Sequence, residues 1–121
     1  MNKAPYKHGA GKEYMYTLKK QYSNRSRPDI HSVKAAISPA EFYPYELPNM
    51  PRTNKGGWQD GGLCVFHNDR HTGSFRVNLD TGAFCCFSCG AKGGDIVAFT
   101  MQRDGLTFPD ALKRLAEDWG V

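Results

Sequence analysis

Two short stretches decide the fold: Cys64-Val65-Phe66-His67 and Cys86-Phe87-Ser88-Cys89-Gly90. In each stretch two residues separate a pair of metal-binding side chains, and this gap lets a tight turn aim both side chains at one ion. Two such turns complete the tetrahedron that zinc prefers, and thiolate and imidazole favour zinc over magnesium or calcium. Since protein side chains fill all four positions, none remains for a reactive water. The spacing therefore predicts one structural Zn²⁺ held by Cys64, His67, Cys86 and Cys89.

The same spacing argues against two other candidate ligands. Cys85 precedes Cys86 in an expected strand, so its side chain points to the opposite face from that of its neighbour. No cysteine or histidine is separated from His71 by the two-residue gap of the half-sites, so His71 lacks a half-site. We therefore expect Cys85 to be an ordinary buried or half-buried thiol and His71 to bind no metal.

A disulfide framework is the alternative use of four cysteines in a short chain. Such frameworks form in oxidising compartments, and no charged segment followed by an apolar one opens this chain as a secretory signal would. No apolar run is long enough to span a bilayer. We therefore expect a cytoplasmic protein with no membrane partner, whose cysteines serve a metal.

The net charge of +4 over 121 residues is unevenly distributed. Residues 1–27 carry seven basic residues against one acidic residue, a net charge of +6, and four tyrosines lie among them. Cations for phosphates and aromatic rings for bases suit a nucleic-acid-binding arm, while a solvated leader without such a role is the alternative. We expect a basic, tyrosine-containing arm over 1–28 and a zinc-binding domain over 29–121.

Periodic apolar residues and capping signals predict two helices before the first half-site and two after the second. The first covers 29–37, and the next begins at Ser38 and is expected to stop at Pro44, leaving a loop over 44–57. Another begins after Asp95 and stops at Gly105. The last begins at Thr107 and carries a core-facing stripe of Phe108, Ala111, Leu112, Leu115, Ala116 and Trp119.

Short strands are expected between these helices, over Trp58 to Leu63, Phe75 to Leu79 and Ala83 to Phe87. The alternation in the second places Phe75, Val77 and Leu79 on one face. A turn at 80–82 joins the second and third strands into a hairpin that connects the two half-sites. The sequence therefore predicts an α+β fold: a small zinc ribbon, with an antiparallel sheet and zinc knuckles, flanked by short helices.

The assembled motifs resemble those of a known family. The string Gly-Leu-Cys-Val-Phe-His-Asn-Asp-Arg, then Gly-Ser-Phe-Arg-Val, then Phe-Cys-Cys-Phe-Ser-Cys-Gly-Ala-Lys-Gly-Gly-Asp is similar to the N-terminal zinc-binding domain of bacterial-type DNA primases. That family's pattern is Cys-Pro-Phe-His-x-(Asp/Glu)-(Lys/Arg), Pro-Ser-Phe and Cys-Phe-x-Cys-Gly-x-x-Gly. The resemblance covers about residues 29–121, and Val65 and Gly73 replace two of its prolines without removing a ligand.

The resemblance implies the same four zinc ligands and a ribbon face that binds single-stranded DNA template. Candidate cations for the phosphates and aromatic rings for the bases are Arg70, Arg76, Lys92, Phe87 and Trp58. Phe87 has an alternative role, because a phenylalanine between zinc ligands often packs into the ribbon.

Two classes of function follow. In the first, the chain is a non-catalytic module that binds single-stranded DNA and assists DNA priming and replication in trans with a separate primase, polymerase or helicase, as would suit a plasmid, phage or integrative element. In the second, the ribbon is a protein-interaction adaptor. A fragment of a full-length primase is a third possibility, since the sequence ends at Val121 without the carboxylate cluster that Mg²⁺-dependent polymerisation needs. We expect no enzymatic activity from these residues alone.

Overall fold

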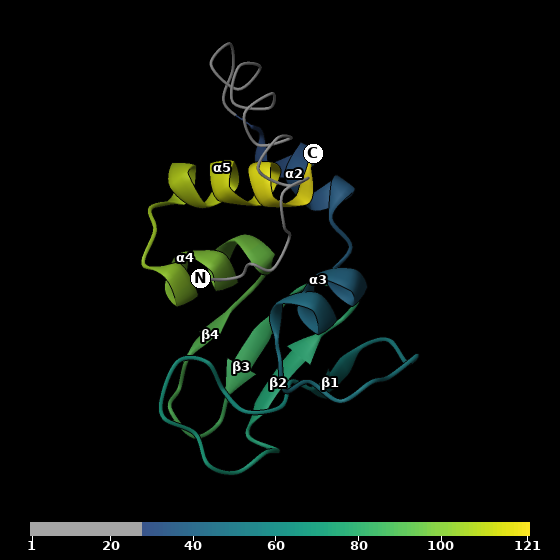
Figure 1. Cartoon of the computed structure of the whole chain (residues 1–121), viewed down its shortest axis with the longest axis vertical. Helices are drawn as coiled ribbons and strands as arrows, with labels where there is room; N and C mark the ends of the chain where they lie inside the picture. Colours follow the sequence, from purple (N-terminus) through teal and green to yellow (C-terminus); the bar gives the residue numbers. More distant parts are fainter. Residues whose placement is uncertain (1–27) are drawn as a thin grey trace.

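The structure is a computed structural model that describes residues 28–121. The predicted arm therefore lies, apart from its last residue, outside the described residues and stays a prediction. Helices and strands follow one another in the order α2 (Ile30–Ala36), α3 (Pro39–Glu46), β1 (Trp58–Asp60), β2 (Phe75–Asn78), β3 (Phe84–Cys86), β4 (Lys92–Gly93), α4 (Ile96–Asp104) and α5 (Phe108–Trp119). This mixture confirms the α+β class (Figure 1).

Each described helix begins where the sequence predicts it, because a capping side chain is present there. In all four cases that side chain accepts a hydrogen bond from a backbone N–H two or three residues further on; the caps are Asp29, Ser38, Asp95 and Thr107. The last two helices end at Gly105 and Gly120, which adopt left-handed conformations with φ of 66° and 70°.

The helix α3 is longer than expected, and the predicted stop at Pro44 is wrong. Proline has no N–H, so Pro44 removes the hydrogen bond to the carbonyl of Ala40 and would ordinarily break a helix. Here the adjacent Phe42 and Tyr43 are fully buried, and the N–H of Leu47 donates to the Tyr43 carbonyl at 2.9 Å. Packing therefore holds the last turn, and the connecting loop begins at Leu47 rather than at Pro44.

The strands form one antiparallel sheet in the order β1-β2-β3-β4. They are shorter than expected: β1 ends at Asp60 because Gly62, with φ of +82°, turns the chain, and its N–H donates to Asp60 Oδ1 at 2.9 Å. The sequence did not reveal β4, which pairs with β3 through Cys85 and Lys92. As predicted, Phe75 and Val77 lie on the buried face and are 0% exposed.

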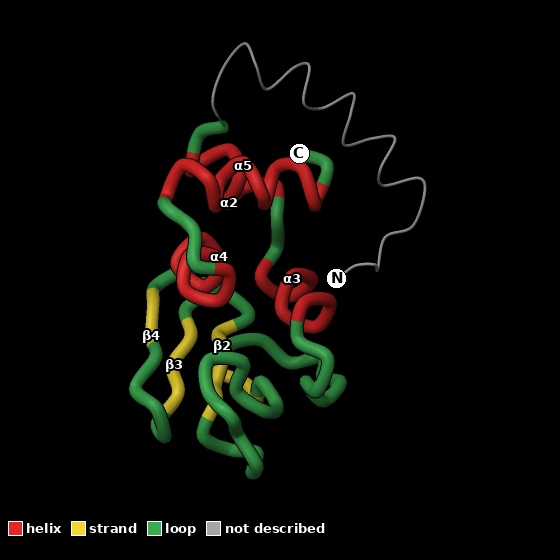
Figure 2. Tube along the Cα trace, turned by 60° about the vertical axis from the view of Figure 1, so that its left-hand side comes forward, coloured by secondary structure: helices red, strands yellow, loops and turns green. Residues whose placement is uncertain are grey.

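Figures 1 and 2 show the helices gathered at one end of the molecule and the sheet at the other. The helices α3 and α4 lie next to the sheet, and α2 and α5 lie beyond α4. Phe99 of α4 is at the centre, with its ring 5.2–5.8 Å from those of Phe42, Tyr43, Phe66 and Phe84. Since Phe66 belongs to the first half-site, the helical core and the half-site share one cluster of aromatic rings.

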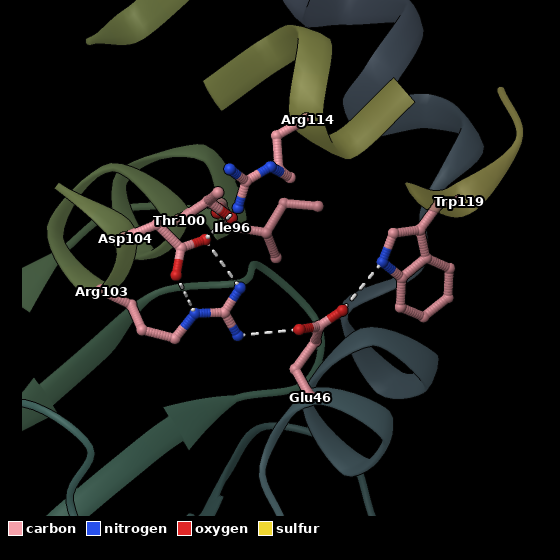
Figure 3. Close-up of polar contacts among 7 residues, drawn as sticks. All are labelled: Glu46, Ile96, Thr100, Arg103, Asp104, Arg114 and Trp119. Atoms are coloured by element: carbon pink, nitrogen blue, oxygen red, sulfur yellow. Dashed lines mark hydrogen bonds and ion pairs between the residues drawn. The ribbon is translucent and has the colours of Figure 1, made fainter. Parts of the chain in front are cut away.

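A polar network joins α3, α4 and α5 (Figure 3). Arg103 Nη1 donates to Glu46 Oε1 at 2.7 Å, while its Nε and Nη2 contact the two carboxylate oxygens of Asp104 at 2.9 and 3.0 Å. Trp119 Nε1 donates to the other Glu46 oxygen at 3.1 Å. The Glu46 side chain is only 3% exposed, so these charged groups are largely removed from water.

The predicted stripe of α5 is confirmed except at its first position. Ala111, Leu112, Leu115 and Ala116 are buried and Trp119 is partly buried, but Phe108 is 43% exposed. Phe108 is the first residue of the helix, and the buried part of the stripe starts one turn later. Among residues 28–121 no helix combines the length and hydropathy needed to cross a bilayer.

Candidate metal centre

The four residues of the two half-sites come together in space. Each offers one ligand atom, and the ligand atoms of Cys64, His67, Cys86 and Cys89 all lie within 4.8 Å of one another. The sulfurs of Cys64 and Cys89 are 3.9 Å apart. Two thiolates at about 2.3 Å from a tetrahedral zinc would be separated by about 3.8 Å, so the spacing suits that ion.

The first half-site is held in place by its own aromatic residue. Phe66 lies between Cys64 and His67 in the sequence, and its ring stacks on that of Phe84 at a centroid distance of 5.4 Å. It also meets the ring of Phe75 at 6.0 Å. Because these partners belong to β3 and β2, the hairpin fixes the turn that presents the first two ligands.

The second half-site begins on a strand and ends in a turn. Cys86 is the last residue of β3 and shares the buried face with Phe84. The chain then turns through Gly90, whose φ is +83° and whose N–H donates to the Cys86 carbonyl at 2.9 Å. A positive φ favours glycine, so the Gly after the last ligand allows the turn that brings Cys89 back to the cluster.

The imidazole of His67 gives an independent test of whether a metal fits. Its Nδ1 is buried and has no hydrogen-bond partner within the described part of the chain. A buried nitrogen without a partner costs about 1–3 kcal/mol, whereas a bond to a metal satisfies it. Its other nitrogen, Nε2, lies 3.5 Å from Asp69 Oδ1. The donor set and the orphaned nitrogen both fit zinc bound through Nδ1.

The electrostatics of the thiols indicate how a metal would change them. Burial raises the pKa of Cys64 to about 12, so this thiol keeps its proton at neutral pH until a cation displaces it. Burial also works against ionisation of Cys86, but the backbone N–H groups of Cys89 and Ser88 outweigh it and lower the pKa of Cys86. Zinc binding is therefore expected to release protons, with Cys86 the easier thiol to ionise.

Sequence reasoning missed Asp69, which contacts both residues of the first half-site. Its Oδ2 accepts the backbone N–H of Cys64 at 2.8 Å, its Oδ1 faces His67, and its side chain is 8% exposed. The N–H of Cys64 is also the main reason why the pKa of the Asp69 carboxyl is lowered. A carboxylate behind a metal-binding imidazole fixes its orientation. The sequence did contain a signal for Asp69, because the primase pattern has an acidic residue two positions after the histidine.

Replacing Asp69 by alanine is expected to lower zinc affinity about 10- to 100-fold, the usual cost of losing a carboxylate that orients a ligand. Competition with a chromophoric chelator measures this change. The matched control is Asp80→Ala, which removes an exposed carboxylate from the turn after β2. Equal zinc affinities for the two variants would show that Asp69 does not position the ligands.

The structure places the remaining candidates differently. Cys85 is partly exposed and lies on the face of β3 opposite Cys86, as predicted. His71 is exposed in the loop after the first half-site and lies outside the cluster, with its N–H 3.4 Å from Asp69 Oδ1. Arg70 is exposed in the same loop.

Three of the five candidate DNA contacts share one face of the sheet. Strand register pairs Trp58 with Asn78, Asp60 with Arg76, and Cys85 with both Arg76 and Lys92. Paired residues point the same way. We call this the outer face, made of Trp58, Asp60, Arg76, Asn78, Cys85 and Lys92. All six are at least partly exposed, so none of the described helices covers this face.

Phe87 follows β3 and extends its pairing, because its N–H donates to the Ser74 carbonyl at 2.9 Å. The side chain is 77% exposed. The packed alternative for a phenylalanine between zinc ligands is therefore wrong for Phe87, although it describes Phe66 in the first half-site well. Phe87 keeps its ring available to a partner.

The fold and the clustered ligands define a zinc ribbon. Residues 51–121 match the family described as the CHC2 zinc finger. The chain belongs to this family, the zinc-binding domain of bacterial DNA primases. It is 44% identical over 93 residues to a DNA primase of Streptomyces coelicolor, and the match covers 77% of this chain and 14% of that protein. Identity to a Listeria monocytogenes DNA primase is 42% over 69 residues, or 57% of this chain and 11% of the relative.

A solved structure agrees with the family assignment. The crystal structure of the zinc-binding and RNA polymerase domains of the Aquifex aeolicus primase matches with a TM-score of 0.60 at 25% identity. The match covers 78% of this chain and 22% of that one. The chain thus corresponds to the zinc-binding part of a primase and not to its catalytic part, and it spans only a small fraction of the relatives.

Proposed function

We propose that this chain is a zinc-stabilised module that binds single-stranded DNA template on the outer face of its sheet and assists priming in trans. In this proposal Cys64, His67, Cys86 and Cys89 hold one Zn²⁺. The ion cross-links the two half-sites and so fixes the hairpin that carries the face. It has no chemical step to perform, because the protein fills every coordination position.

The observation that carries the DNA-binding proposal is the register of the outer face. Arg76 and Lys92 lie on β2 and β4, two strands apart, which corresponds to about 10 Å. They provide separated cations for backbone phosphates, while the 47% exposed ring of Trp58 and that of Phe87 offer stacking surfaces. Asp60 lies next to Arg76 in register and reduces the local positive charge. Binding should consequently be weak and strongly dependent on salt.

Replacing Arg76 by alanine is expected to weaken binding of a single-stranded oligonucleotide and to flatten the log–log salt dependence by about one unit. Arg70→Ala should act in the same direction. The matched control is Lys113→Ala, which removes an exposed cation from α5, away from the sheet. Fluorescence anisotropy over a range of salt concentrations measures these slopes. An unchanged slope in Arg76→Ala would rule out the outer face as the DNA site, and an unchanged slope in Arg70→Ala would exclude the neighbouring loop from it.

A protein-interaction adaptor is the second candidate, favoured by exposed apolar residues on both half-sites. Val65 is 37% exposed and Phe87 is 77% exposed. Contacts made through such side chains depend little on salt. The salt experiment therefore separates the two functions. An adaptor would bind its primase, polymerase or helicase partner with a nearly flat salt dependence. Its affinity for that partner would be the same in Arg76→Ala as in the parent.

Incubated alone with single-stranded template, nucleotides and Mg²⁺, this chain is expected to make no primers. Nucleotidyl transfer needs Mg²⁺ held by clustered carboxylates. Across residues 28–121, the Cys-His-Cys-Cys cluster is the one group of three or more ligating side chains placed to hold an ion, and its donors suit zinc. Adding a catalytic primase domain should change the frequency or position of initiation, as measured on sequencing gels. Primer synthesis by the chain alone would contradict the non-catalytic proposal.

A further inference from the structure

The sheet edge beside β1 contains a hollow that neither the metal cluster nor the outer face explains. Its volume is about 340 Å³, and the loop Pro51–Lys55 lines it together with Gln59 and Asp60. This volume is near the lower end of the range of about 300–1,000 Å³ that small-molecule sites occupy. The hollow therefore has room for one small group and not for several nucleotides. The loop leads from α3 into β1 (Figure 1).

Two of the three charged side chains that line the hollow are cations, and the third is Asp60. Arg52 and Lys55 are both exposed, and within residues 28–121 neither forms an ion pair. The remaining lining is mostly neutral and polar, and it includes no aromatic ring on which a base could stack. Two cations without an aromatic platform suit the charged backbone of a nucleic acid better than its bases.

Two hydrogen bonds hold the walls of the hollow in place. The N–H of Lys55 donates to Thr53 Oγ1 at 3.1 Å, and Gln59 Nε2 donates to the Gly56 carbonyl at 2.8 Å. The first fixes the loop between the two cations, and the second ties it to β1. A loop that is ordered before its ligand arrives loses less entropy on binding.

Asp60 connects the hollow to the outer face. It lines the hollow, and it is also the register partner of Arg76. Since neighbouring strands are about 4.8 Å apart, the hollow lies just beyond the point where a strand of DNA would leave Arg76. The carboxylate of Asp60 already accepts the N–H of Gly62, which engages one of its oxygens.

From these observations we infer that Arg52 and Lys55 bind a backbone phosphate of the same DNA strand that crosses the outer face. The inference rests on the proposed function and extends it by one contact beyond β1. It makes the DNA path longer than the sheet is wide, so only oligonucleotides that reach past β1 should use this contact.

The double variant Arg52→Ala, Lys55→Ala tests the inference in the full chain. With a single-stranded oligonucleotide of about twelve nucleotides, we expect the Kd to rise about tenfold and the salt slope to fall by about two units, one for each cation. With one of about four nucleotides, bound mainly on the outer face, we expect little change. Zinc content should equal that of the parent, and Lys113→Ala again serves as the control.

The outcomes separate this inference from the proposed function. If the double variant binds the longer oligonucleotide like the parent while Arg76→Ala binds it more weakly, the phosphate site is wrong and the outer face stands. If Arg76→Ala also has no effect, both proposals are wrong. A third outcome would overturn the strand contact. The double variant would leave DNA affinity unchanged, while a nucleoside triphosphate would shift the NMR signal of the Gln59 side-chain amide in the parent protein. The hollow would then be a site for free nucleotide.

Discussion

The variant Cys86→Ser is expected to lose tight zinc binding and the folded structure of its ribbon, whereas Cys85→Ser should keep both. The two residues are adjacent in the sequence but lie on opposite faces of β3, so the comparison holds the local chain constant. Structural zinc contributes about 10–16 kcal/mol in zinc-finger peptides, as much as or more than the whole stability of a typical domain at about 5–15 kcal/mol. Losing the ion should therefore unfold the ribbon over residues 58–94.

Metal analysis and near-ultraviolet circular dichroism measure the two effects separately. Chelation of the parent protein should reproduce the spectrum of Cys86→Ser, because Phe66 connects the first half-site to the aromatic core. Zinc loss in Cys85→Ser with retention in Cys86→Ser would reverse the ligand assignment. A chelated parent with an unchanged spectrum would show that the core folds without the ion.

The second large effect is expected for Arg103→Ala. This change removes the guanidinium that faces Glu46 at 2.7 Å and Asp104 at 2.9 Å. Burial alone would lower the pKa of Arg103, but hydrogen bonds and charges from Asp104 and Glu46 outweigh it, so the pKa is raised. Removing one partner of a buried ion pair costs about 3–5 kcal/mol, which in a domain of this size lowers the Tm by about 12 °C or more.

Thermal unfolding of the zinc-loaded protein provides the measurement for this prediction. The control is Arg114→Ala, which removes a 45% exposed arginine that contacts the same Asp104 at 3.3 Å. Exposed ion pairs contribute about 1 kcal/mol or less, so this variant should lose only a few degrees. Arg103→Met, which keeps part of the side-chain packing, should lose nearly as much as Arg103→Ala. Similar small losses in the Arg103 and Arg114 variants would show that the network joining the three helices contributes little.

The parts of the fold that the sequence predicted are those that local chemistry determines. A cap such as Thr107 specifies a helix start by itself, and the alternation of Phe75 and Val77 specifies a buried face. The grouping of the four candidate ligands followed from their spacing alone. Each of these signals extends over a few neighbouring residues and needs no knowledge of the rest of the chain.

Features that depend on distant contacts were not predictable in this way. Pro44 stays helical because its neighbours are buried against other elements, and the two-residue strand β4 is too short to show any alternation. Phe66 and Phe87 each lie between two ligands, yet one packs into the core and the other is exposed. Nothing in the local sequence distinguishes them, since Phe66 is held by the distant rings of Phe75, Phe84 and Phe99, which Phe87 does not contact.

The position of Cys85 has a practical consequence for studying the outer face. Its thiol lies between Arg76 and Lys92 in register, and it is the one cysteine of this chain outside the cluster. With zinc bound, the other three sulfurs coordinate the metal. A thiol-directed fluorophore would then attach at a single native position, in the middle of the surface that we propose binds DNA. Such a label would report directly on occupancy of that surface without any engineered cysteine.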